Sequence, residues 1–164
     1  MSNVFHPTGD QLTNALRALG VNFIMGGQDN NDALSKHPAR LIAALSQSSE
    51  ARLRLALVPL FLEHSEFAAH VRAVAQKLDP AARLTLQCYY TAAVILGRQY
   101  QPQKKSLPDY FSKYINLSLA DNPAENLRAL AKRHRELSGA RVNWLGTYQH
   151  AAQVWLKGLE YQKV

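Results

Sequence analysis

Apolar residues recur every three or four positions along most of this chain, which is the period of an α-helix. From Pro38 onward this helical period is almost uninterrupted. The pattern predicts a first helix from about Thr8 to Gly20 and then helices over residues 39–45, 49–62, 65–78, 80–100, 107–115, 123–137 and 141–159. We therefore expect an all-α, single-domain helical bundle of about six to eight helices.

Local signals mark the starts of several of these helices. Asp79 precedes Pro80, and Asn122 precedes Pro123, which places a capping side chain before a proline at the first helical position. Ser49 is the expected N-cap of the helix that follows it. These signals fix three of the predicted boundaries.

Proline and glycine predict where helices bend or end. Pro59 lies inside a predicted helix and should kink it or split it after Val58. Ser138 and Gly139 separate the last two long helices, which favours an antiparallel hairpin between them.

Two helices have distinctive apolar surfaces. The segment 80–100 is apolar on nearly every side, so we expect it to be the buried central helix of the bundle. The last helix repeats Trp144, Tyr148 and Trp155 at close to heptad spacing. That stripe is either core or a surface that docks a partner, because tryptophan and tyrosine are common interface anchors.

The first 37 residues are organised differently from the rest. A helix is followed by the β-prone sequence VNFIMGG, the one plausible strand, and then by a polar, turn-rich loop over residues 28–38. One strand cannot form a sheet, so we expect an extended segment packed on helices. The prediction is an arm over residues 1–37 and a main bundle over residues 38–164, within one domain overall.

Composition narrows the class of protein. Hydrophobic residues make up 47% and charged residues 19% of the 164, which is globular composition. The N-terminus lacks the basic start and apolar core of a secretory signal, and no apolar run approaches the length of a membrane span. A single cysteine, Cys88, cannot form an internal disulfide. We expect a cytoplasmic protein.

Net charge points to an acidic partner. The chain carries 19 Lys and Arg against 12 Asp and Glu, a formal charge of +7. Such an excess suits nucleic acid, although it also keeps small proteins soluble. The basic residues that we expect to contact a nucleic-acid backbone are Arg98, Lys104, Lys105, Arg128, Lys132, Arg135 and Arg141.

The helix over residues 123–137 also carries an arginine and a histidine six positions apart, Arg128 and His134. This spacing resembles the short motif of the HEPN superfamily, small helical-bundle domains that include metal-independent ribonucleases. The resemblance implies two motifs that meet at a dimer interface, with Arg128 on the scissile phosphate and His134 in proton transfer. The family more typically has a polar residue directly after the arginine, where this chain has Ala129. The alternative is that His134 packs in the core between Leu130 and Leu137.

A vaguer resemblance connects the segments ALRALGVNFIMGG and RLRLALVPLFLEH to small helical proteins encoded beside bacterial nucleotidyltransferases. No motif can be extracted from it.

Three functions stay open from the sequence. The leading prediction is a non-enzymatic helical subunit that binds RNA or DNA backbone within a bacterial multi-protein assembly. The alternatives are an HEPN-like ribonuclease of the toxin type, and a protein-interaction module or homodimer that docks through the Trp144 stripe. Histidine and cysteine spacings predict no metal site, and no sequence motif predicts a cofactor.

Overall fold

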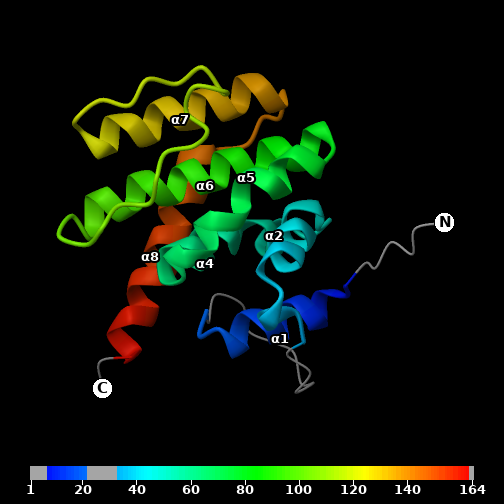
Figure 1. The fold of residues 1–164 in the computed structure, drawn as a ribbon. Helices are drawn as coiled ribbons and strands as arrows, with labels where there is room; N and C mark the ends of the chain where they lie inside the picture. The colour runs from blue at the N-terminus through cyan, green and yellow to red at the C-terminus, as the bar shows by residue number, and fades with distance from the viewer. Residues whose placement is uncertain (1–6, 22–32, 163–164) are drawn as a thin grey trace.

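Helices form every regular element in residues 7–21 and 33–162, the parts of the chain that the computed structural model describes (Figure 1). The α-helices are α1 Gly9–Ala18, α2 Pro38–Gln47, α3 Ala51–Leu55, α4 Leu57–Glu63, α5 Ala68–Lys77, α6 Pro80–Tyr100, α7 Pro123–Ser138 and α8 Trp144–Gln162. Two short 3-10 helices, η1 Ala33–Lys36 and η2 Ser65–Phe67, complete the list. The predicted all-α bundle is confirmed.

Helix α6 occupies the centre of the bundle. It packs against α2, α4, α5, α7 and α8, and its side chains are buried almost continuously from Leu86 to Leu96. A helix that is apolar on all sides reaches its lowest free energy when other helices surround it. The predicted central helix over residues 80–100 is therefore confirmed, with the same bounds.

Helices α7 and α8 do not form the expected antiparallel hairpin. Figure 1 shows α7 running back along α6, whereas α8 leads away from α7 toward α4. Gly139 ends α7 with a φ of 68°, a left-handed conformation that suits glycine. Near the other end of α8, the Trp155 Nε1 donates a hydrogen bond to Glu63 Oε1 at 2.6 Å, which ties α8 to α4.

Residues 107–117 form a turn that is not the helix predicted over residues 107–115. Local polar contacts and a left-handed residue accompany this turn. The Asp109 carboxylate accepts hydrogen bonds from the backbone N–H and the hydroxyl of Ser112, and Asn116 adopts a left-handed φ of 56°. We call this segment the 107–117 turn.

Tertiary hydrogen bonds hold the 107–117 turn against two helices. The Tyr90 hydroxyl, on α6, donates to the Pro108 carbonyl at 2.7 Å. The Arg133 Nε, on α7, donates to the Ile115 carbonyl at 2.9 Å. A helix over residues 107–115 would have bonded the Pro108 carbonyl internally, whereas the Ile115 carbonyl would have been among its unpaired last four. The hydrophobic period of the sequence contains no information about either bond.

Pro59 breaks its helix earlier than predicted. The helix is interrupted at Ala56, between α3 and α4, and not after Val58, although Ala56 itself keeps right-handed helical backbone angles. A proline has no N–H to donate to the carbonyl four residues earlier, which here belongs to Leu55, so the turn before the proline is the weak point.

Two of the three predicted helix caps are confirmed. The Asp79 side chain accepts from Ala82 N, and the Asn122 side chain accepts from Ala124 N and Glu125 N. Ser49 is not a cap, because α3 begins one residue later and Glu50 occupies the N-cap position without a side-chain hydrogen bond.

The N-terminal helix belongs to the same core as the rest. Thr8 caps α1 in a capping box with Gln11, and Leu12, Ala15 and Leu16 join the common hydrophobic cluster. Most of the predicted extended segment and polar loop, residues 22–32, lies outside the described residues. Within the described ranges, no helix is long and apolar enough to cross a bilayer.

Candidate nucleic-acid interface

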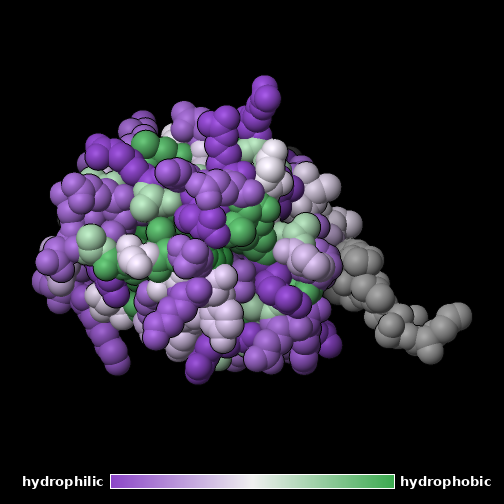
Figure 2. All heavy atoms as spheres, turned by 90° about the horizontal axis from the view of Figure 1, so that it is seen from above, coloured by the Kyte–Doolittle hydropathy of each residue, from purple (hydrophilic) through white to green (hydrophobic). Residues whose placement is uncertain are grey.

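The outer face of α7 carries the basic stripe that the sequence predicts. Arg128, Lys132 and Arg135 are exposed, and none of them forms an ion pair with another described residue. The first and the last are seven positions apart on the helix, so the stripe is roughly 10 Å long. Figure 2 looks down on the α7 side and shows hydrophilic side chains over most of this face. Arg141, just beyond α7, is exposed as well.

The inner face of α7 is apolar and closely packed. Leu127, Leu130 and His134 are buried, and α7 makes its most extensive contacts with α6. Asn126 is also buried, and its amide exchanges two hydrogen bonds with the backbone of Ala120. These contacts fix the rotation of α7, and so they fix the direction in which the basic stripe points.

His134 is a core residue in an aromatic cluster. Its Nδ1 lies 2.6 Å from the Tyr148 hydroxyl, and its ring stacks on Trp144 with centroids 3.5 Å apart. Tyr89 meets both His134 and Tyr148 edge to face. The imidazole is only 2% exposed, and burial lowers its pKa from 6.5 to about 4. His134 is therefore neutral at pH 7.

The structure does not bring Arg128 and His134 together. Six residues place their side chains about 120° apart around the helix, with Arg128 in solvent and His134 inside. His134 borders a cavity of about 580 Å³, and among the described residues that line it Arg54 is the one arginine. This arrangement gives the ribonuclease alternative no support.

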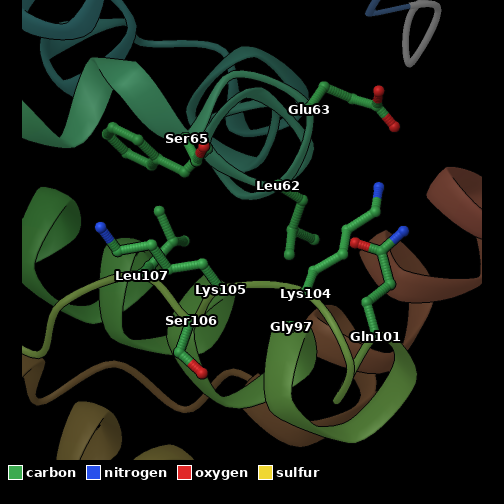
Figure 3. A pocket seen from close by; sticks show the side chains of 10 residues that line it. Leu62, Glu63, Ser65, Gly97, Gln101, Lys104, Lys105, Ser106 and Leu107 are labelled. Atoms are coloured by element: carbon green, nitrogen blue, oxygen red, sulfur yellow. The ribbon is translucent and has the colours of Figure 1, made fainter.

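Lys104 and Lys105 lie away from α7, in the segment after α6. They border a cavity of about 300 Å³ together with residues of α4, η2 and α6, and no α7 residue lines it. Figure 3 shows their ammonium groups diverging to opposite sides of this cavity. Arg98 is partly buried in the last turn of α6. The cavity that Lys104 and Lys105 line therefore does not include the α7 stripe.

The aromatic stripe of α8 faces inward. Tyr148 is 0% exposed and Trp155 is 4% exposed, while Trp144 is partly buried against the ring of His134. Tyr148 and Trp155 are therefore core residues, and Trp144 is the one member of the stripe with a partly exposed side chain. The docking alternative stays a prediction.

A basic pocket that the sequence did not indicate lies between α5, α6 and the 107–117 turn. Its volume is about 530 Å³. We call it the Tyr114 pocket, and its polar and aromatic lining residues are Arg72, Gln76, Arg83, Gln87, Phe111 and Tyr114. The turn-forming residues Pro108 and Asp109 were the available signal, since they argue against a helix that begins at Leu107.

Acid–base and metal chemistry have few candidate groups here. Burial raises the pKa of the Cys88 thiol to about 12, so it stays protonated and unreactive. In residues 7–21 and 33–162, no three His, Cys, Asp or Glu side chains are grouped to hold a metal ion.

The fold and these surfaces define a class, an all-α bundle with a basic outer helix. Comparison with protein-family models, curated proteins and solved structures finds no match for the chain. The resemblances to HEPN domains and to proteins encoded beside nucleotidyltransferases therefore stay predictions.

Proposed function

We propose that this protein is a non-enzymatic helical subunit that binds the phosphate backbone of nucleic acid through the outer face of α7. The observation that carries the proposal is the exposed stripe of Arg128, Lys132 and Arg135, none of which forms an ion pair with a described acidic side chain. Exposed cations on one helix face release condensed counterions when they contact phosphates, and that release drives binding.

The stripe places like charges next to one another on the helix, because Arg128 and Lys132 are four residues apart and Lys132 and Arg135 are three apart. Such pairs cost a helix a few tenths of a kcal/mol each, and Glu125 and Glu136, three and four residues from Arg128 and Lys132, offset part of this cost. An anionic partner would convert this repulsion into attraction.

Binding and its dependence on salt test the proposal. A fluorescent single-stranded RNA and a duplex DNA are titrated at several salt concentrations with wild type and with Arg128→Gln/Lys132→Gln/Arg135→Gln. The triple variant should bind more weakly, and the slope of log K against log salt should fall by about 2 to 3, since each lost phosphate contact removes 0.7 to 0.9.

A matched variant controls for net charge. Lys36→Gln/Arg40→Gln/Lys157→Gln removes three exposed cations from α2, η1 and α8, and it should leave the slope nearly unchanged. An equal fall of the salt slope in both variants would show that binding depends on net charge and not on the α7 face, and it would contradict the proposal. The same RNA, separated on a gel afterward, tests the ribonuclease alternative.

The proposal also includes a cytoplasmic location and membership of a larger assembly. A cytoplasmic location agrees with the one buried, reduced cysteine. Membership of a larger assembly is tested by purifying the tagged protein with and without nuclease and measuring the molecular mass of the complex.

A further inference from the structure

We propose that the Tyr114 pocket binds one nucleotide of a single strand, with its base on the Tyr114 ring and its phosphate beside Arg72. This inference rests on the proposed function and adds to it a preference for unpaired bases. The main observation is the ring of Tyr114, which is 79% exposed and lies at the edge of a cavity lined by two arginines and two glutamines. Bases of every type can stack on such a ring.

The Tyr114 ring stands on a well-anchored support. The 107–117 turn is held by the hydrogen bonds from Tyr90 and Arg133, and Phe111 beneath it is buried against the ring of Tyr90. A large, exposed side chain on an anchored turn is prepared to receive a ligand with little loss of conformational entropy. Folding itself gains little from so exposed a ring.

The charges around the pocket favour an anion. The Arg72 guanidinium lies 4.4 Å above the Tyr110 ring, which holds it in place and leaves its donors for a ligand. Arg83 donates to the carbonyls of Ala75 and Leu78 at the end of α5, which fixes a second positive charge at the pocket wall. None of the residues that line the pocket is acidic.

The size and polarity of the cavity suit one nucleotide. A volume of about 530 Å³ lies within the usual range for small-molecule sites. Gln76 and Gln87 offer amide donors and acceptors, which can pair with the edge of any base. Bases inside a duplex are already stacked and paired, so the ring can receive them only from a single strand.

The 107–117 turn, which forms one wall of the pocket, is attached to α7. Arg133 of α7 donates a hydrogen bond to the carbonyl of Ile115, the residue next to Tyr114. The inference therefore includes a single strand that contacts both α7 and the pocket on either side of this turn.

The test compares two fluorescent single strands of equal length and charge, one of thymidines and one of abasic sites. Wild type should bind the thymidine strand roughly tenfold more tightly than the abasic strand. Tyr114→Ala should remove this preference and leave the salt slope unchanged, whereas Tyr114→Phe should retain it because the ring remains. Duplex binding should be the same in all three proteins.

The outcomes separate this inference from the proposed function. If wild type binds both strands equally, or if Tyr114→Ala keeps the preference, the inference is wrong even when the α7 variant loses its salt slope. If the α7 variant binds as wild type does while Tyr114→Ala loses the preference, the result supports nucleotide binding in the Tyr114 pocket and contradicts backbone binding by α7. Thermal unfolding of Tyr114→Ala should match wild type, since the side chain is exposed.

Discussion

The two faces of α7 show how one helix can separate folding from binding. The inner face buries Leu127, Leu130 and His134 against α6 and α8, while the outer face exposes three cations without ion partners among the described residues. Buried groups decide stability because they lose water and gain close contacts. Exposed cations of one sign contribute almost nothing to stability. The outer face is therefore free to be selected for a partner.

The largest expected effect of one substitution at neutral pH comes from a cavity in the inner face. Leu130→Ala should lower the free energy of unfolding by about 3 kcal/mol, because Leu130 is fully buried and its neighbours cannot collapse completely into the space. Urea denaturation followed by circular dichroism measures the change. Lys132→Ala, two residues away on the outer face, is the control and should change it by less than about 0.5 kcal/mol. Equal losses in both variants would contradict the division between the faces.

Acidic pH should destabilise the inner face through His134. The folded-state pKa of about 4 lies below the ordinary 6.5, so the unfolded chain binds this proton first as pH falls. The free energy of unfolding should therefore be highest above pH 6.5 and fall between pH 6.5 and 4, by up to about 1.4 kcal/mol per pH unit from this group.

A variant without the imidazole isolates this effect. His134→Asn cannot titrate in this range, so its free energy of unfolding should depend less on pH between 6.5 and 4 than that of wild type. Urea denaturation at several pH values gives both curves. Parallel curves would mean that His134 is accessible to protons in the folded protein, and this result would reopen the catalytic alternative.

The hydrophobic period predicted the bundle and its central helix because both depend on repeated, local patterns. It failed at the 107–117 turn, where Tyr90 and Arg133, distant in sequence, donate the hydrogen bonds that hold the turn. Pro108 and Asp109 were local signals against a helix that begins at Leu107, and the apolar spacing of Leu107, Phe111 and Ile115 concealed them. That spacing is real, since all three side chains are buried, but a turn buries them as well as a helix does.

The candidate site was predictable only where one helix supplies all of it. Arg128, Lys132 and Arg135 share a face of α7 by helical geometry alone. Lys104 and Lys105 come from a different segment, and nothing in the sequence determines whether they join that face. The Tyr114 pocket draws on α5, α6 and a turn, so it depends on packing that residue spacing does not encode.

The smallest of these effects tests one hydrogen bond within the inner face. Tyr148→Phe removes the hydroxyl that lies 2.6 Å from His134 Nδ1 and leaves that buried nitrogen without this partner. The free energy of unfolding should fall by about 1 to 2 kcal/mol, which is the usual cost of an unsatisfied buried polar group. Tyr114→Phe removes a hydroxyl from an exposed ring and should change it by less than about 0.5 kcal/mol. If Tyr148→Phe were equally harmless, the hydrogen bond would not hold His134 in place, and apolar packing against Tyr89 and Trp144 would alone determine the inner face.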